Sequence, residues 1–147
     1  MKVAQVDAST NKVKQVILVN KNVCLGPSGA VTQAATEAHC DPLYGAGDKY
    51  YPLLSTTKNY PCVGFNYDAS KDMYYEDQPY ADWTLNDSTG IWEAPVDFVN
   101  GGGVYSKETW DTGSATWFSK KLGDMDGNWW KWNKSTNVWE DTGSTSK

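Results

Sequence analysis

The sequence predicts a mainly β protein, α+β at most, in which an N-terminal β-hairpin domain with one short helix precedes an array of Trp-containing β-hairpins. Two observations lead to this fold class: a repeat with the chemistry of a hairpin turn, and aromatic residues that alternate with polar ones around it. Each copy of the repeat has a large apolar residue at positions 1 and 8, Asp or Asn at position 2, and a small polar run containing Ser or Thr between them. The five copies occupy residues 6–13 (VDASTNKV), 67–74 (YDASKDMY), 85–92 (LNDSTGIW), 110–117 (WDTGSATW) and 132–139 (WNKSTNVW).

Position 2 of the repeat supplies the turn. An Asp or Asn side chain can accept a hydrogen bond from the backbone two residues further on, and a Gly or Asn three to four residues later tolerates the left-handed conformation. Asn86 and Gly90 occupy these two places in the third copy, and Asn133 and Asn137 occupy them in the fifth. They predict a hairpin loop of about four to five residues.

Aromatic residues flank the loops at the period of a half-buried strand. Trp130, Trp132 and Trp139 alternate with polar neighbours around the fifth copy, as do Trp83 and Leu85 before the third. One face of each hairpin is therefore expected to be aromatic. Because an isolated two-stranded hairpin is only marginally stable in water, we expect the hairpins to stack on one another, on a core or on another protein.

The N-terminal part of the chain has a different pattern. Residues 2–6 and 13–19 predict the two strands of an opening hairpin, and the continuous apolar end of the second strand is expected to be buried on both faces. Residues 32–40 are rich in helix formers and begin with Thr32, which can cap a helix that Asp41-Pro42 and Gly45 then stop. Residues 44–62, rich in Tyr and Pro, are expected to be irregular.

Connecting segments divide the chain. Pro-containing connectors lie at residues 76–79 and 94–97, and a flexible Asn-Gly-Gly-Gly segment occupies residues 100–103. These connectors predict three parts: an N-terminal β domain with one short helix (1–62), central hairpins (63–99) and C-terminal Trp-rich hairpins (104–147).

The composition argues against several classes of partner. The chain has 147 residues and a formal charge of −5, with its Lys and Glu residues scattered. A nucleic-acid-binding protein would need a basic face, so no nucleic acid is expected. No apolar run is long enough to span a bilayer, and the N-terminus lacks the apolar core and cleavage site of a signal peptide, so no membrane is expected either. We expect the protein to be made and released in a cytosol.

Side chains that carry catalytic or metal chemistry are sparse. His39 adjoins Cys40 at the end of the expected helix, and adjacent helical residues do not face each other, so a packed histidine is favoured over a nucleophile with its base. Together with Cys24 and Cys62 they form no zinc motif, and the three cysteines predict buried thiols or a fortuitous pair rather than a disulfide framework. Residues 124–128 (DMDGN) favour a turn over a calcium loop. No catalytic residue, metal site or cofactor is predicted, and the chain is not expected to be an enzyme.

The tryptophans allow two interpretations. Exposed on hairpin faces, they could stack on sugar rings or bind a partner protein. Paired across their own strands, they would form the hairpin cores, and their regular spacing from the turns favours this role for most of them. The residues concerned are Trp83, Trp92, Trp110, Trp117, Trp130, Trp132 and Trp139.

The middle of the chain carries a resemblance to a known family. The segments LYG (43–45), YPCVGFNYD (60–68), QPYADWTLN (78–86) and IWEAP (91–95) follow one another along the chain. In this order they resemble small virion-associated structural or accessory proteins of marine tailed phages, especially cyanophages. The resemblance extends over roughly residues 2–118, with Phe65 where the family usually has Tyr, and the remaining residues look like an extra hairpin repeat. It implies a virion component without assigned catalytic residues.

Two functions follow as hypotheses. The first is a non-enzymatic structural protein of a tailed-phage virion: a capsid decoration or cement protein bound in multiple copies to the major capsid protein. The alternative is a tail or tail-fibre accessory protein that binds host surface glycan or another tail protein. The capsid is favoured because the chain lacks the coiled-coil or β-helix repeats of a fibre shaft. Partner contacts are expected at Val16, Leu18, Tyr50, Tyr51 and Tyr60.

Overall fold

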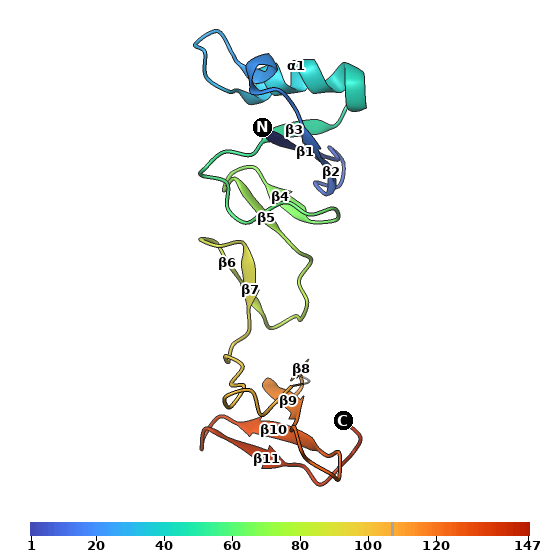
Figure 1. Cartoon of the computed structure of the whole chain (residues 1–147), viewed down its shortest axis with the longest axis vertical. Helices are drawn as coiled ribbons and strands as arrows, with labels where there is room; N and C mark the ends of the chain where they lie inside the picture. Colours follow the sequence, from blue (N-terminus) through green and yellow to red (C-terminus); the bar gives the residue numbers. More distant parts are fainter. Residues whose placement is uncertain (107) are drawn as a thin grey trace. The chain divides into compact units, whose positions relative to one another are not determined.

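The computed structural model describes residues 1–106 and 108–147. Within them the chain forms one α-helix, one short 3-10 helix and four antiparallel β-sheets (Figure 1). The elements are β1 (Lys2–Val6), β2 (Val13–Leu18), η1 (Lys21–Cys24), α1 (Gln33–Tyr44), β3 (Lys49–Pro52), β4 (Asn66–Asp68), β5 (Met73–Tyr75), β6 (Thr84–Asn86), β7 (Ile91–Glu93), β8 (Thr109–Asp111), β9 (Thr116–Lys120), β10 (Trp129–Asn133) and β11 (Val138–Asp141). The mainly β class predicted from the sequence is confirmed.

Every copy of the repeat forms a hairpin. Positions 1 and 8 are direct cross-strand partners in the pairs Val6↔Val13, Tyr67↔Tyr74, Trp110↔Trp117 and Trp132↔Trp139. Position 6 has a positive φ in all five copies, which explains the frequent Asn and Gly there. The residues are Asn11 (56°), Asp72 (47°), Gly90 (73°), Ala115 (45°) and Asn137 (54°). The predicted turn chemistry is confirmed.

The position-2 side chain organises each loop. The Asp7 carboxylate accepts hydrogen bonds from the backbone N–H of Ser9 and of Thr10, both at 2.9 Å, and from the Ser9 hydroxyl at 2.6 Å. The Ser9 hydroxyl and the two amides favour the charged carboxylate and lower the pKa of Asp7 from 3.8 to about 2. The equivalent side chains Asp68, Asn86, Asp111 and Asn133 also accept from backbone N–H groups of their own loops.

The described chain divides into two compact units. Unit 1 comprises Met1–Pro79 and Leu85–Trp92, and unit 2 comprises Tyr80–Thr84 and Glu93–Lys147. The boundary therefore passes through β6 and β7 along the chain. The predicted domain limits at residues 62, 99 and 104 stay predictions.

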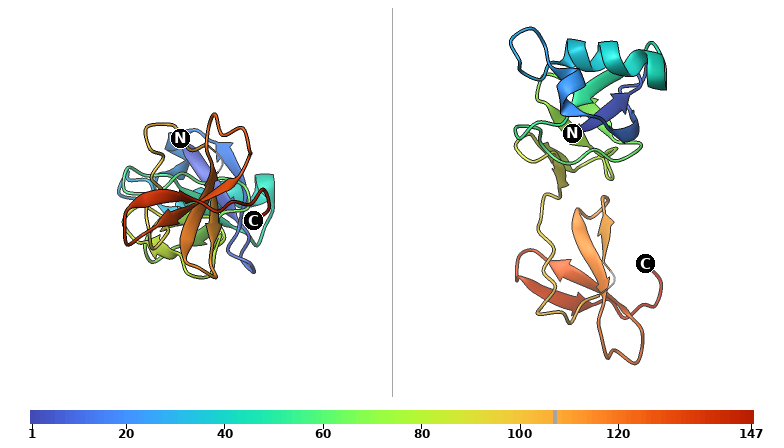
Figure 2. Two further views of the ribbon diagram at one scale, coloured as in Figure 1. Left: turned by 90° about the horizontal axis from the view of Figure 1, so that it is seen from below. Right: turned by 45° about the horizontal axis from the view of Figure 1, so that its top comes forward.

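In unit 1 a three-stranded sheet has the order β2-β1-β3. Helix α1 lies along one face of this sheet (Figure 2), where Val3 and Tyr50 pack with Cys24 and Cys40. The hairpin β4–β5 covers the other face, where Ala4, Val6 and Val13 pack with Tyr74. Both faces of the central strand β1 are thus buried.

Two expectations about unit 1 are wrong. Strand β2 is an edge strand, so its apolar end is not buried on both faces: Val16 and Ile17 are half-buried and Leu18 is 77% exposed. Residues 44–62 are not irregular throughout, because β3 pairs with β1. The repeat pattern could not reveal β3, since its partner lies more than forty residues earlier in the chain.

Helix α1 has the predicted N-terminal cap but a later end. The Thr32 hydroxyl oxygen accepts a hydrogen bond from the Ala35 N–H at 3.2 Å. The helix then continues through Pro42, contrary to the prediction, and stops at Gly45, whose N–H donates to the Asp41 carbonyl at 3.2 Å. A proline this close to the end removes one backbone hydrogen bond without interrupting a long helix, and the positive φ of Gly45 ends it.

The third hairpin is held in unit 1 by its turn. Gly90 is buried, and its carbonyl accepts a hydrogen bond from the Asn59 side chain at 3.0 Å. Lys58 donates to the Asp87 carbonyl at 2.9 Å, and the Lys71 ammonium pairs with the Asp87 carboxylate at 2.7 Å. These contacts stack one repeat on another, as the marginal stability of a single hairpin requires.

Candidate functional site

The core of unit 2 is a cluster of tryptophans on one face of the sheet β11-β10-β9-β8. Trp110, Trp117, Trp132 and Trp139 are each 9% exposed or less. The cross-strand pairs Trp110–Trp117 and Trp132–Trp139 pack edge to face, with ring centroids 5.1 and 5.5 Å apart. This geometry is favourable for aromatic pairs and places their large apolar area inside the unit.

A loop segment covers this aromatic face. The indole N–H of Trp117 donates to the Val96 carbonyl at 2.6 Å, and that of Trp139 donates to the Val99 carbonyl at 2.7 Å. The Trp110 indole N–H lies 3.0 and 3.1 Å from the two carboxylate oxygens of Asp82. The covering segments thus satisfy the polar atoms of these three buried indoles. These tryptophans therefore act as hairpin core, the role that the sequence favoured.

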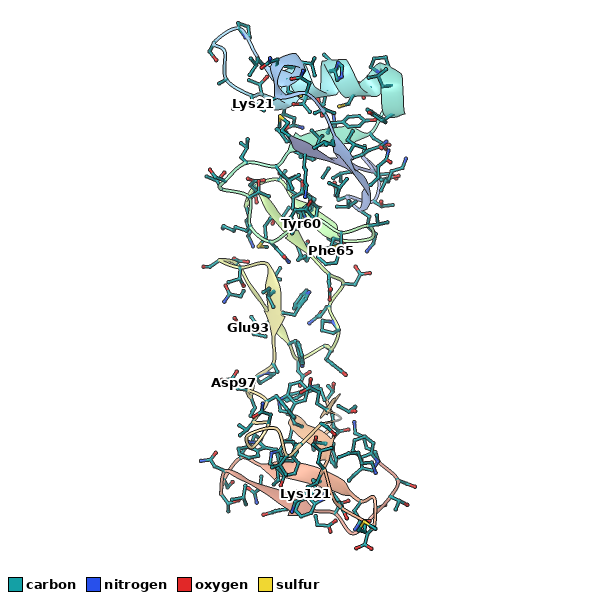
Figure 3. All side chains as sticks on the ribbon, viewed as in Figure 1. Lys21, Tyr60, Phe65, Glu93, Asp97 and Lys121 are labelled. Carbon is teal, nitrogen blue, oxygen red and sulfur yellow. The ribbon has the colours of Figure 1, made fainter. Side chains whose placement is uncertain are left out.

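Of the remaining tryptophans of the predicted set, Trp83 and Trp130 pack against this core, and Trp92 belongs to unit 1. Trp83 is half-buried and packs edge to face with Trp110 and Trp117. Trp130 is half-buried, donates to the Asp124 carboxylate at 2.9 Å and has the Lys121 ammonium 4.2 Å from its ring centroid; Lys121 is labelled in Figure 3. Trp92, in unit 1, donates to the Glu76 carbonyl at 2.9 Å and packs edge to face with Tyr75.

Two of the residues predicted to contact a partner lie together on unit 1. Lys2 is the cross-strand partner of Leu18, and its ammonium lies 4.7 Å from the ring centroid of Tyr60. A shallow depression of about 350 Å³ adjoins them, lined in part by Leu53 and Leu54. Leu18 is 77% exposed, Leu54 48% and Tyr60 47%; Tyr60 is labelled in Figure 3. We name the surface formed by these five residues the Lys2 patch.

The other three predicted partner residues lie elsewhere in unit 1. Tyr50 is fully buried, and its hydroxyl donates to the Gly45 carbonyl at 2.8 Å, so it belongs to the core rather than to the surface. Tyr51 is half-buried and its ring centroid lies 4.1 Å from that of Tyr67. Val16 is half-buried and packs against the same core residues as Tyr51 and Tyr67. A surface role for Tyr50 is therefore excluded in the folded chain, and partner contacts of Tyr51 and Val16 stay a prediction.

Groups with catalytic or metal-binding chemistry are scattered. His39 is half-buried on α1. In the described residues the three cysteines are free thiols. Cys24 and Cys40 are buried, and Cys62 is exposed. Burial raises the pKa of Cys40. Across residues 1–106 and 108–147 no group of three or more His, Cys, Asp or Glu side chains is placed to hold a metal ion.

The second face of the unit 2 sheet carries a candidate site that was not predicted from the sequence. Because strand neighbours point to opposite faces, Phe118 and Trp129 lie on the face opposite Trp117 and Trp130. Lysine side chains of the same face lie over both rings. The signal was present in the sequence, because the alternation that predicts an aromatic face also identifies the residues of the opposite one.

Comparisons of the chain with protein-family models, with curated proteins and with solved structures found no match. In the part of the chain that the structure describes, no helix combines the length and the apolarity that crossing a bilayer requires.

Proposed function

We propose that this chain is a non-enzymatic structural protein of a tailed-phage virion, a decoration or cement protein that binds the major capsid protein in multiple copies. The observation that carries the proposal is the Lys2 patch. Leu18, Leu54 and Tyr60 expose apolar area beside one charged side chain, Lys2. An exposed apolar surface with a polar border is typical of a protein-binding site.

The motif order in residues 43–95 supports the virion as the place of action, through the resemblance to phage particle proteins. The architecture is consistent with this role. The sheets β4–β5 and β6–β7 have two strands each, and a sheet of this size is only marginally stable by itself. Cement proteins gain stability by burying apolar surface against several neighbouring chains. We propose that the Lys2 patch is the part of unit 1 that contacts the shell.

Quantitative mass spectrometry of purified particles tests the virion assignment. The copy number of this protein is measured against those of the major capsid protein and the portal. A ratio near that of the capsid subunit, or a simple fraction of it, is the expected result. A few to tens of copies would instead favour the alternative, a tail or tail-fibre accessory protein. Absence from the particle would refute both assignments.

Two matched variants test the patch. Leu18→Lys places a charge in the patch, and Leu122→Lys places one at an exposed leucine of unit 2. Both leucines are mostly exposed, so both variants are expected to fold. We expect Leu18→Lys to lower the copy number per particle and Leu122→Lys to leave it unchanged. Equal incorporation of the two variants would refute the patch as the contact surface.

A further inference from the structure

One face of the unit 2 sheet lies opposite the tryptophan cluster and carries lysines paired with aromatic rings. Trp129 and Lys120 are cross-strand partners, with the ammonium 4.5 Å from the ring centroid. Lys131 and Phe118 are also cross-strand partners, with the ammonium 5.8 Å from the centroid, and the Lys147 ammonium lies 5.2 Å from the same ring. We name the surface formed by these five residues the lysine–aromatic face.

The two cross-strand pairs must share a face of the sheet. Phe118 and Lys120 are two residues apart on β9, and Trp129 and Lys131 are two residues apart on β10. Residues at this spacing point to the same side of a strand. All four side chains are half-buried, so each is held in place while part of its surface stays open to solvent.

A depression of about 290 Å³ extends this face toward the two neighbouring hairpin turns. Lys131 lines it together with Asn133, Glu140 and the serines of the turns, Ser114 and Ser135. This volume is at the lower end of the range for small-molecule sites. Lys131 thus belongs both to the aromatic pair and to a polar hollow that offers hydrogen-bond donors and acceptors.

The charges of the face differ from those of the whole chain. Lys120, Lys131 and Lys147 gather on it in a protein with a formal charge of −5. Two carboxylates lie beside these lysines. Glu140 is the cross-strand partner of Lys131. The hydrogen bonds from Ser114 lower the pKa of Asp111, and Lys147 and Lys131 lower it further. Each carboxylate also accepts a hydrogen bond from its own hairpin, Asp111 from Ser114 at 2.5 Å and Glu140 from Asn133 at 2.7 Å. A ligand with negative groups spaced along its length would complement the lysines.

Flat aromatic rings beside polar groups suit the apolar faces of sugar rings. The Lys120 ammonium also donates to the Gly127 carbonyl, and the Lys147 ammonium donates to the Trp110 carbonyl at 3.1 Å. An ammonium has three N–H donors, so each of these lysines keeps donors for an anionic ligand. The contact of an ammonium with a ring is weak at an exposed site, so a sugar can replace the ammonium on the ring. The polar hollow favours a sugar over a nucleic acid, because the many hydroxyl groups of a sugar can bond to Asn133, Glu140 and the serines of the turns.

We propose that the lysine–aromatic face binds an anionic polysaccharide, whose carboxylate or sulfate groups pair with Lys120, Lys131 and Lys147 while its sugar rings stack on Phe118 and Trp129. The inference rests on unit 2 alone and does not depend on the virion assignment. Of the seven tryptophans first considered for stacking on sugars, Trp110, Trp117, Trp132 and Trp139 are buried on the opposite face.

Binding of defined oligosaccharides to the full chain tests the proposal. Oligogalacturonate supplies carboxylates, sulfated dextran oligosaccharides supply sulfates, and neutral dextran oligosaccharides of equal length supply neither. Affinity is measured by calorimetry at low and at high salt, and the contact surface by NMR shift changes in the ¹⁵N-labelled protein. Binding of at least one anionic ligand, with shifts at residues 116–120 and 129–133, is the expected result. The ligand that binds identifies the anionic group.

Matched lysine variants provide the control. Lys131→Gln removes one charge from the lysine–aromatic face, whereas Lys121→Gln removes the charge that lies over Trp130 in the tryptophan cluster. Lys131→Gln is expected to weaken binding about tenfold, as for the loss of a charge-assisted hydrogen bond, and Lys121→Gln to leave it unchanged. Thermal melting confirms that both variants fold.

Three results would overturn the proposal. The first is no binding of either anionic ligand. The second is equal binding of neutral dextran, which would show that the lysines are not used. The third is a stronger and salt-sensitive binding of an oligo-dT strand, which would assign the face to single-stranded nucleic acid instead.

Discussion

Replacing Gly90 by alanine tests how the third hairpin is held in unit 1. Gly90 has φ +73°, and a Cβ there would lie 2.6 Å from the Tyr74 carbonyl oxygen and 3.0 Å from side-chain atoms of Asn59 and Met73. The left-handed conformation costs alanine about 1–2 kcal/mol. Relieving the clash with a backbone oxygen adds about 1–3 kcal/mol, as for overpacked cores. We expect Gly90→Ala to lower the free energy of unfolding by about 2–5 kcal/mol in total.

Gly29→Ala is the matched control. Gly29 also lies in unit 1 and has φ +77°, but a Cβ there would meet no atom within 4 Å. It should lose only the conformational contribution, about 1–2 kcal/mol. Both variants gain the same rigidity in the unfolded chain, so their difference isolates the close approach to Tyr74.

Urea denaturation of the two variants measures this difference. The indole N–H signal of Trp92, which is hydrogen-bonded to the Glu76 carbonyl, reports on the hairpin by NMR. We expect this signal to shift in Gly90→Ala and to stay in place in Gly29→Ala. Equal unfolding midpoints for the two variants would refute the packing of the Gly90 turn against β5.

Three further predictions concern stability. Within the described residues the buried Tyr74 hydroxyl has no hydrogen-bond partner, whereas the Tyr67 hydroxyl donates to Asp72 at 3.0 Å. Tyr74→Phe should therefore raise the free energy of unfolding by about 1 kcal/mol, and Tyr67→Phe should lower it by about the same amount. Urea denaturation measures both changes, and changes of the same sign would contradict this prediction. Ala115 has φ +45°, so Ala115→Gly should stabilise the protein by about 0.5–1 kcal/mol, and a lower melting temperature would count against the turn geometry. Asp7 has a folded-state pKa of about 2, below its ordinary value of 3.8, so its contribution to stability is present above pH 3.8 and is lost as the pH falls through about 2. Asp7→Asn should therefore reduce the fall in stability between these two pH values. An acid denaturation profile that is unchanged in this variant would contradict the lowered pKa.

The hairpins could be predicted because their signal is local. The side chain at position 2 and the left-handed residue at position 6 lie within the same eight residues, as Asn133 and Asn137 do. The cross-strand pair Trp132↔Trp139 follows directly from this loop length. A helix cap is local in the same way, so Thr32 was also identified correctly.

The candidate surfaces were predicted only in part. Leu18 and Tyr60 were named as partner contacts, and the structure brings both to Lys2. Tyr50 lies in the same Tyr- and Pro-rich segment as Tyr60 but is buried, because β3 pairs with the central strand β1 and this side chain points toward the helix. No local pattern distinguishes the two tyrosines.

The sequence by itself determined the fold class and the five hairpins, since turn chemistry and strand alternation act between near neighbours. Only the tertiary structure decided which face of each hairpin is buried. The indole of Trp139 is bonded to Val99, forty residues earlier, and Gly90 packs against Tyr74 of another repeat. Such contacts join residues far apart in the chain, and alternation marks two faces of a strand without stating which one a distant segment will cover.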